Sequence, residues 1–593
     1  MPADTLRSQL NHEPVPLKFG TSGRRGLLIH LTQLEVYINA LAELEYLQSL
    51  PLAEGGVTRG DEFFFGFDLR PSSSFRVPEA NGGGELAQAI ERAIRDAGME
   101  PVNLGRLPTP ALACHALERR RGSMMVTGSH IPAEYNGYKT YSSKGELRKP
   151  DELPITRLAE QVRQRLYDQP ADQSLFDPQG QFKSGHTELS VEVMDARDGY
   201  LSRYADFFAG RSLAGKRILV YQHSAVGRDL LVEMLRHFGA EAIPAGRCEE
   251  FVPIDTENVE PDQLARIQAL VNDAWATHGS LDAVVSTDGD SDRPMVFGLE
   301  AAAVGTKDNP PGRVRFFSGD LVGMIVAEFL PADAVVVPIT CNDAIDRSPL
   351  QNIMEPKTRI GSPYVIEGME GASARGRKAV CGWEANGGFL TGSDIRQGDR
   401  LLRALPTRDA MLPILSVLFA AAEQGLSLCG LFDRLPKRFG RAALLKKFPR
   451  PVSLKIVREF SPLADEIAEI RFQTGGAVFL DKRRSELACS DHWLTAAMET
   501  RAVLQGFFTP DLGFGEISRL NYTDGVRIYF DNGDIAHVRP SGNADELRIY
   551  AVADTLARAE AIVQAGIAEP RGILRQLEES LREMVGRGGL AAP

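Results

Sequence analysis

The sequence predicts an α/β protein of several domains: three related mixed-sheet α/β domains followed by a C-terminal α+β domain. Three observations lead to this prediction. The chain has 593 residues, too many for a single hydrophobic core, so about three or four domains are expected. In three regions a short apolar run passes through a turn toward a helical pattern, the order of elements typical of parallel α/β layers. The C-terminal region lacks this order and carries a hairpin signal.

The three α/β regions contain apolar runs that predict buried strands. These runs are FFFGFD at 63–68, RILVYQ at 217–222 and AVVVPI at 334–339. Helices are expected over 85–97 and 228–238, where apolar residues recur at helical spacing. The hairpin is predicted within 526–540, where Asn532 and Gly533 separate two alternating runs.

Polar, turn-rich stretches predict the domain boundaries. They lie at 168–190, 301–313 and 433–450. We therefore expect domains over residues 1–190, 191–310, 311–436 and 437–593. Because ligands of α/β sheets gather at the carboxyl ends of strands, the functional groups are expected in the loops that follow the strands.

Composition and charge exclude several classes of function. Lys and Arg number 67 against 79 Asp and Glu, and the net charge of −12 argues against non-specific binding to nucleic acid or anionic membranes. The longest apolar stretch, 411–422, is shorter than the roughly 20 residues of a membrane span, and the N-terminus has no apolar signal-peptide core. We expect a cytoplasmic protein. Its six cysteines are far apart, so a bound metal would have oxygen ligands.

A polar turn follows the strand predicted at 124–126. It begins TGSHIP at 127–132 and leads to Lys139. Ser129, at the end of a strand with His130 beside it and Lys139 near in sequence, could act as a nucleophile. An ordinary polar turn uses the same residue types, so these residues alone leave both interpretations open.

Three aspartates on alternate positions follow the strand predicted at 281–286. Asp288, Asp290 and Asp292 can turn their carboxylates onto one hard cation such as Mg²⁺ or Ca²⁺. An EF-hand is excluded because Arg293 stands where that loop needs glycine. A solvated acidic turn is the alternative, although three like charges so close repel one another unless a cation compensates them. The guanidinium of Arg293 suits phosphoryl oxygens.

Three further loops carry groups that bind anions or hydroxyls. The runs GTSGRRG at 20–26 and RPSGN at 539–543 combine Gly, Ser and Arg, which suit phosphate. Glu384 and Asn386 place a carboxylate and an amide in one loop, and such groups suit sugar hydroxyls. Each loop is a weak signal alone, because ordinary turns have the same composition. Together with the serine and the aspartates they favour phosphoryl transfer on a polyol.

At these residues the chain resembles the α-D-phosphohexomutase superfamily, which includes phosphomannomutases, phosphoglucomutases and amino-sugar mutases. Five blocks agree in order: FGTSGRRG (19–26), TGSHIPAEYNGYK (127–139), DGDSDR (288–293), WEANGG (383–388) and RPSGNADELRIY (539–550). The resemblance implies three related α/β domains and a fourth, unlike domain around a central cleft. It also implies interconversion of hexose 1-phosphate and hexose 6-phosphate, of mannose or glucose, through a phosphoserine enzyme and a 1,6-bisphosphate intermediate.

The resemblance further implies a role for each motif residue. Mg²⁺ is expected on Ser129, Asp288, Asp290 and Asp292, with the phosphoryl group carried by Ser129. The groups implied around that phosphoryl are Arg25, His130, Lys139 and Arg293, and proton transfer stays open between His130 and Lys139. The groups implied for the sugar and its second phosphate are Glu384, Asn386, Arg539, Ser541, Gly542, Asn543 and Arg548. The hexose 1,6-bisphosphate is the implied activator.

Two departures from the family pattern leave alternatives open. Asn386 and Gly388 stand where hexose-specific bacterial members often have Ser and His, and this loop looks like that of eukaryotic N-acetylglucosamine-phosphate mutases. The chain is also longer than compact bacterial members. An N-acetylglucosamine- or glucosamine-phosphate mutase, a bisphosphate-releasing phosphotransferase and a metal-dependent phosphatase remain alternatives. A non-catalytic sugar-phosphate binding protein is disfavoured, because no catalytic residue type is missing. The expected partner is a sugar phosphate, and the oligomeric state, monomer or dimer, stays open.

Overall fold

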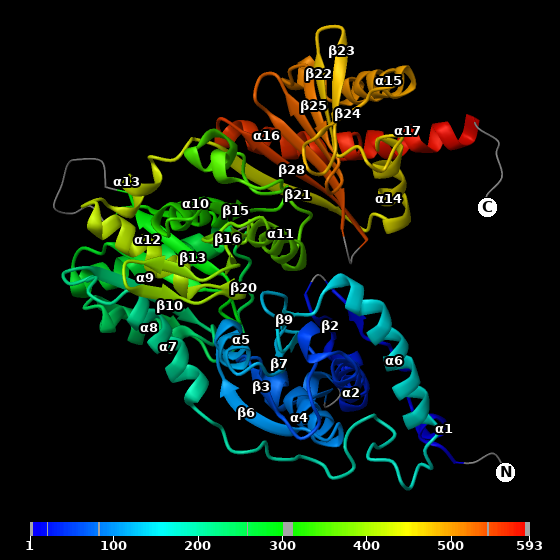
Figure 1. The fold of residues 1–593 in the computed structure, drawn as a ribbon, viewed down its shortest axis with the longest axis vertical. Coiled ribbons are helices and arrows are strands. Elements are labelled where there is room, and N and C mark those ends of the chain that lie inside the picture. Colours follow the sequence, from blue (N-terminus) through cyan, green and yellow to red (C-terminus); the bar gives the residue numbers. More distant parts are fainter. Residues whose placement is uncertain are drawn as a thin grey trace. The chain divides into compact units, whose positions relative to one another are not determined.

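The computed structural model describes residues 4–20, 22–80, 83–257, 259–300, 312–541 and 545–587. The chain divides into two compact units (Figure 1). They are Met1–Ala334 with Gly361–Phe432, and Val335–Ile360 with Asp433–Pro593. The predicted fold class is confirmed: the first unit contains mixed α/β sheets and the second an antiparallel sheet with helices. The four domain boundaries stay a prediction, and residues 301–311 of one boundary lie outside the described residues.

The first sheet of the first unit combines parallel strands at one end with antiparallel strands at the other. Its order is β1 (Lys18–Phe19), β2 (Arg24–Leu27), β8 (Tyr135–Ser142), β7 (Ser123–Val126), β3 (Glu62–Phe67) and β6 (Glu100–Arg106), with β9 (Gly145–Glu146) paired to β8. The strand β3 runs parallel to both β6 and β7, whereas β8 is antiparallel to β7. The apolar run predicted at 63–68 therefore became a buried inner strand.

Several helices belong to the region of this first sheet. They are α1 (Leu6–Gln9), α2 (Gln33–Ser49), α3 (Pro71–Ser74), α4 (Leu86–Asp96), α5 (Thr109–Glu118) and α6 (Lys149–Tyr167). The helix α2 packs against both α4 and α6 (Figure 1), which explains why nearly all of its residues are buried. The helix predicted over 85–97 is α4, and its apolar stripe faces the core beneath β3 and β6.

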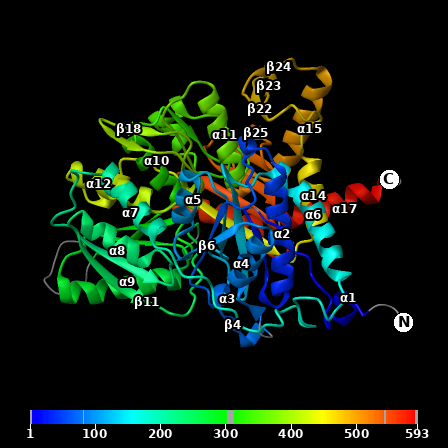
Figure 2. The same ribbon diagram turned by 60° about the horizontal axis from the view of Figure 1, so that its bottom comes forward.

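A second mixed sheet supplies the aspartate loop. Its order is β11 (Glu241–Arg247), β10 (Arg217–His223), β12 (Ala283–Thr287), β13 (Pro294–Leu299) and β14 (Val314–Phe317). The helices of this region are α7 (Asp195–Phe207), α8 (Arg228–His237) and α9 (Pro261–His278). The helices α8 and α9 lie against β10 and β11, and Figure 2 shows both helices beside β11. Because β10 and β12 are parallel and β13 returns antiparallel, the loop of 288–293 leaves the carboxyl end of a buried strand.

The third group of strands in the first unit is short and antiparallel. It comprises β16 (Val380–Trp383), β17 (Phe389–Thr391) and β20 (Leu405–Asp409), with a separate pair β18 (Ile395–Gln397) and β19 (Arg400–Leu402). Its helices are α10 (Gly319–Phe329), α11 (Ser362–Ala374), α12 (Met411–Glu423) and α13 (Leu428–Phe432). The strand β15 (Ala334–Val336) lies where the chain passes into the second unit, and it is shorter than the predicted run because Pro338 and a turn follow.

The second unit is built on one antiparallel sheet. Its order is β21 (Phe439–Lys446), β28 (Glu546–Ala553), β27 (Ile535–Pro540), β26 (Val526–Phe530), β25 (Ile517–Asn521), β22 (Glu469–Gln473), β23 (Gly476–Leu480) and β24 (Glu486–Leu487). The predicted hairpin is β26 and β27. The helices are α14 (Arg450–Glu459), α15 (Asp491–Phe507), α16 (Leu556–Ile567) and α17 (Ile573–Arg587).

Two further sequence expectations can be compared with this structure. Within the described part of the chain, no helix is both long and apolar enough to cross a membrane. The six cysteines are free thiols, four of them buried.

Candidate functional site

The serine loop begins where β7 ends. Ser129 has a φ of +54°, a left-handed conformation that costs a non-glycine residue about 1–3 kcal/mol unless its surroundings enforce it. The backbone N–H of Ser129 donates to Thr127 Oγ1 at 2.7 Å, and Arg70 Nη2 donates to the carbonyl of Ser129 at 3.1 Å. Asp68 Oδ2 in turn accepts from Thr127 Oγ1 at 2.8 Å. These bonds fix the serine in its strained position.

Arg70 is a site residue that the sequence analysis missed. It is buried, and its guanidinium also donates to the carbonyls of Ile131, Pro132 and Tyr135. A Cβ on Gly128 would lie 2.6 Å from the Cζ of Arg70, so glycine is needed there for the arginine to pass. The position of Arg70 in the turn after an apolar strand was the available signal, but a buried structural arginine has no sequence signature of its own.

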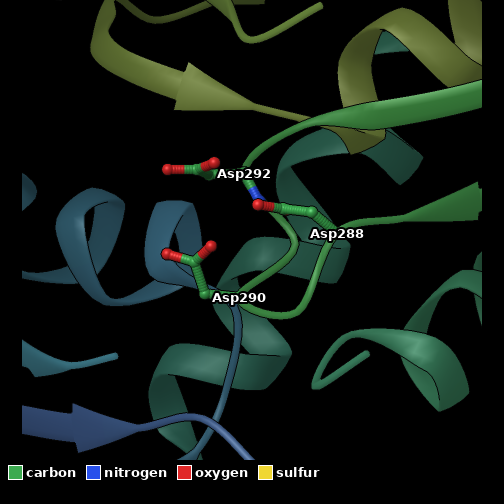
Figure 3. A group of neighbouring side chains, drawn as sticks. All are labelled: Asp288, Asp290 and Asp292. Carbon is green, nitrogen blue, oxygen red and sulfur yellow. The ribbon is translucent and has the colours of Figure 1, made fainter. Parts of the chain in front are cut away.

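The aspartate loop joins β12 to β13. The side chains of Asp288, Asp290 and Asp292 are buried, and Figure 3 shows their carboxylates on one side of the loop. One oxygen from each lies within 4.8 Å of the others. Among the described residues, Asp290 Oδ1 and Asp292 Oδ1 are buried without a hydrogen-bond partner. Unpartnered carboxylate oxygens grouped in this way fit a hard divalent cation such as Mg²⁺.

The serine and the aspartates meet in one site. Ser129 Oγ donates to Asp288 Oδ2 at 2.8 Å. Lys139 Nζ, from β8, donates to Asp290 Oδ2 and to Asp292 Oδ2, both at 2.7 Å. The structure therefore brings together five residues that the sequence analysis selected from two separate motifs.

Burial makes ionisation of all three aspartates unfavourable. Burial, and then the like charges of Asp290 and Asp292, raise the pKa of Asp288 well above its ordinary value. Burial opposes ionisation of the other two as well, but Lys139 lowers the pKa of Asp290 and Arg408 lowers that of Asp292. The three carboxylates can all ionise when a cation shares their charge.

Three more predicted residues lie at this site. His130 Nδ1 is 3.4 Å from Ser129 Oγ, and burial, followed by the charges of Arg293 and Arg25, lowers the pKa of His130 well below its ordinary value. Burial and then Arg293 lower the pKa of Arg25 to about 10. Arg293 Nε is 3.6 Å from Asp292 Oδ1. Two guanidinium groups beside a neutral imidazole make this region receptive to an anion.

The turn between β16 and β17 carries the two residues predicted for the sugar. Glu384 is buried, and its Oε2 accepts from Arg408 Nη1 at 3.1 Å. Asn386 Oδ1 accepts from the N–H of Gly388 at 2.9 Å, so the amide oxygen caps its own turn. The carbonyl of Asn386 accepts from Thr256 Oγ1 at 2.7 Å, which ties the turn to the loop before α9.

Arg408, on β20, is a second residue that the sequence analysis missed. Its side chain is 3% exposed, and its Nε donates to Asp292 Oδ2 at 3.1 Å. Arg408 thus contacts both the aspartate loop and the sugar turn. Nothing in the run LPTRD marks Arg408 as more than an ordinary arginine near the end of a strand, because its two partners are distant in sequence.

The predicted phosphate loop lies in the second unit. Arg539 Nε donates to Asp524 Oδ1 at 3.0 Å, and Arg548 Nη2 donates to Glu546 Oε2 at 2.8 Å. The N–H of Ser541 donates to the carbonyl of Glu546 at 3.1 Å, which closes the turn between β27 and β28. Gly542 and Asn543 lie outside the described residues.

Three family models match successive parts of the chain. Phosphoglucomutase/phosphomannomutase α/β/α domain I matches residues 16–166, α/β/α domain III of the same family matches 318–439, and its C-terminal domain matches 495–568. Among solved structures, a phosphoglucomutase/phosphomannomutase family protein from Burkholderia thailandensis has a TM-score of 0.59 at 16% identity, covering 95% of this chain and 97% of that one. This likeness shows the fold.

Two curated relatives extend the match to nearly the whole chain. A phosphomannomutase of Sinorhizobium fredii (strain NBRC 101917 / NGR234) is 35% identical over 553 residues, covering 93% of this chain and 98% of the relative. A phosphomannomutase of Salmonella muenchen is 34% identical over 550 residues, covering 92% and 94%. With this identity along its length and its buried aspartate triad, the chain belongs to the phosphoglucomutase/phosphomannomutase family of the α-D-phosphohexomutase superfamily and is a phosphotransferase isomerase of carbohydrate metabolism.

Proposed function

We propose that this chain interconverts hexose 1-phosphate and hexose 6-phosphate, with mannose and glucose as its preferred hexoses. The observation that carries the proposal is the hydrogen bond of 2.8 Å from Ser129 Oγ to Asp288. The other two aspartates of the triad each keep a buried oxygen without a hydrogen-bond partner among the described residues. A nucleophilic hydroxyl held on a divalent-cation site is what phosphoryl transfer requires. The phosphomannomutase relatives support mannose as a substrate.

Asp288, Asp290 and Asp292 would hold Mg²⁺, with Ser129 as a further ligand. When bound, the ion neutralises negative charge on the transferring phosphoryl group. Arg25 and Arg293 would contact the phosphoryl oxygens, since both guanidinium groups lie near Asp292 and close to one another. The six free thiols support a reducing compartment, so we place the enzyme in the cytoplasm.

The phosphoryl group carried on Ser129 would pass to the free hydroxyl of a hexose monophosphate. A P–O bond to the sugar oxygen forms as the bond to Ser129 Oγ breaks, and the hydroxyl proton moves to a base. We assign this base to His130, because burial keeps its imidazole neutral and its Nδ1 is 3.4 Å from Ser129 Oγ. Lys139 Nζ is instead engaged by two carboxylates.

The bound hexose 1,6-bisphosphate would then turn around and return its other phosphoryl group to Ser129. Glu384 and Asn386 would bind the sugar hydroxyls, since both lie in the turn that Arg408 and Thr256 hold. Arg539, Ser541, Gly542, Asn543 and Arg548 would hold the phosphate that is not reacting. In this scheme the four proposed domains each supply one loop: the serine, the aspartates, the sugar turn and the phosphate loop.

The test is a mutase assay run in parallel on mannose, glucose and N-acetylglucosamine 1-phosphates with Mg²⁺. We expect isomerisation of the first two to exceed that of the third. Ser129→Ala should abolish isomerisation while circular dichroism shows an intact fold. Ser143→Ala, whose hydroxyl bonds only the carbonyl of Gly56 among the contacts of the described chain, should retain it. Near-normal turnover of Ser129→Ala, or steady release of inorganic phosphate or bisphosphate in place of isomerised product, would overturn the proposal.

A further inference from the structure

Arg408 is a buried arginine that bonds carboxylates from two different loops. Its Nε donates to Asp292 Oδ2 and its Nη1 donates to Glu384 Oε2, each at 3.1 Å. Asp292 belongs to the aspartate loop and Glu384 to the turn between β16 and β17, and both are buried. A planar guanidinium that holds two carboxylates makes the position and charge of each depend on the other.

The chain makes room for this guanidinium at Gly388. A Cβ at position 388 would lie 2.4 Å from Cδ and 2.5 Å from Cγ of Arg408, so a larger residue would displace the arginine stem. The other end of the contact is equally specific. Asp292 Oδ2 accepts from both Arg408 and Lys139, whereas Oδ1 has no hydrogen-bond partner within the described residues and lies 3.6 Å from Arg293 Nε. Arg408 and Lys139 thus occupy one oxygen of Asp292, and the other oxygen, which makes no hydrogen bond within the described residues, can bind a metal ion.

We propose that Arg408 is a positioning residue that couples the sugar turn to the metal site. The negative charge of the Glu384 carboxylate balances part of the positive charge of the Arg408 guanidinium. Without the charge of Glu384, Arg408 is left with Asp292 as its principal carboxylate and competes more strongly with a cation for it. The inference rests on the proposed function for assigning Glu384 to the sugar and the aspartates to Mg²⁺. Its consequence is that a change at Glu384 alters Mg²⁺ affinity through Arg408.

The test titrates Mg²⁺ alone into the full chain by isothermal titration calorimetry, with no sugar present. The proteins compared are the wild type, Glu384→Gln, Arg408→Gln and the double variant. We expect Glu384→Gln to weaken Mg²⁺ binding roughly three- to tenfold when Arg408 is present, the usual range for residues in one network. In the Arg408→Gln background the same change should alter the affinity less than about twofold. An equal loss in both backgrounds, or no loss in either, would overturn the coupling.

Arg408→Lys serves as the second variant if Arg408→Gln does not fold. A lysine keeps the charge but cannot present the same planar pair of donors, so Glu384→Gln should again leave Mg²⁺ affinity nearly unchanged. A full loss in the lysine background would mean that the effect travels directly through space, which contradicts the proposal.

The matched control is Arg403→Gln. The side chain of Arg403 is 67% exposed, and its Nη1 lies 3.9 Å from Asp394 Oδ2, which makes a weak surface ion pair. The Mg²⁺ affinity of this variant should equal that of the wild type, and a shift comparable to that of Glu384→Gln would overturn the assignment to Arg408. The titration contains neither sugar nor turnover, so its result stands apart from the mutase assay. A chain that isomerises hexose phosphates but shows additive Mg²⁺ affinities keeps the proposed function and loses this inference. A wild type that binds no Mg²⁺ also overturns it.

Discussion

Ser129 illustrates how individual side chains build this site. Its left-handed backbone is unfavourable by itself, and the N–H and C=O of the same residue are held by Thr127 and Arg70. The hydroxyl is thereby aimed at Asp288 before any substrate arrives. The strain is thus compensated by one hydrogen bond within the loop, to Thr127, and one from Arg70 in the turn after β3, which is how an active site pre-positions a nucleophile.

Two buried histidines should make the stability of the fold depend on pH. Burial lowers the pKa of His223 to about 4 and that of His537 to about 3. Each Nε2 bonds a backbone carbonyl, of Thr287 and Asp524 respectively. In the unfolded chain both histidines have a pKa of about 6.5. Below that pH the unfolded state therefore takes up protons that the folded state does not. Stability must therefore decrease as the pH falls.

The expected loss is about 1.4 kcal/mol per pH unit for each histidine between about pH 6.5 and the folded-state pKa. Thermal denaturation followed by circular dichroism at pH 7.0 and pH 5.0 measures it. The midpoint of the wild type should fall on acidification. His537→Gln, which keeps a donor near the carbonyl of Asp524, should fall less. Equal shifts in the two proteins would show that His537 does not remain neutral.

At the scale of elements, the loops that follow β7 and β12 form the site because small residues let them approach. A Cβ on Gly289, between two of the aspartates, would lie 2.7 Å from the carbonyl oxygen of Ser129. The aspartate loop cannot shift freely, since Asp290 Oδ2 also accepts from Thr109 Oγ1 at 2.6 Å and from Lys139 Nζ at 2.7 Å. The distance between nucleophile and metal site therefore depends on the absence of one side chain.

We therefore expect Gly289→Ala to separate the two loops and to lower kcat/KM on the order of 100-fold, the usual cost of displacing catalytic groups by about 1 Å. The added Cβ would also lie 2.9 Å from Cε2 of Phe251, and we expect the fold to persist because both contacts are confined to loops around the site. The matched control is Gly199→Ala within α7, where an added Cβ meets no atom within 4 Å. That variant should keep full activity and gain up to about 1 kcal/mol of stability. Equal activity of the two variants would contradict the role given to the close approach.

The sequence predicted elements well where the pattern was local. The strands β3, β10 and β12 followed from apolar runs, and the β26–β27 hairpin from Asn532-Gly533. The strand at 334–339 was predicted too long, because an apolar run does not show where the backbone turns. Arg70 and Arg408 were missed for a related reason. Their partners come from other loops, so their importance exists only in the folded chain.

At the scale of the whole molecule, the net charge of −12 hides a local group of cations at the site. The serine and the aspartates are surrounded by Arg25, Lys139, Arg293 and Arg408. The net charge of the whole chain does not reveal this group, because it sums over all residues. The order of apolar runs, turns and helical patterns correctly predicted an α/β chain. It could not have shown the division into two units, because one segment of the second unit, Val335–Ile360, is inserted between parts of the first.

Because the chain divides into two units, we expect a bound cation to stabilise one unit and not the other. The three aspartates all belong to the first unit, so Mg²⁺ that binds the folded site stabilises that unit by about 2.7 kcal/mol at a concentration 100 times the dissociation constant. Hydrogen exchange read by mass spectrometry can follow each unit separately. With Mg²⁺, peptides covering β12 and the loop to Arg293 should exchange more slowly.

Peptides covering β26 and β27 of the second unit should exchange at the same rate with and without the ion, since they carry none of the three aspartates. Asp290→Asn is the control. It removes a charged ligand but keeps an oxygen and the shape of the side chain, so the protection of the first unit should be lost while the second unit stays as it was. Equal protection of both units in the wild type would mean that the cation acts on the chain as a whole, and protection that survives in Asp290→Asn would place its binding outside the triad.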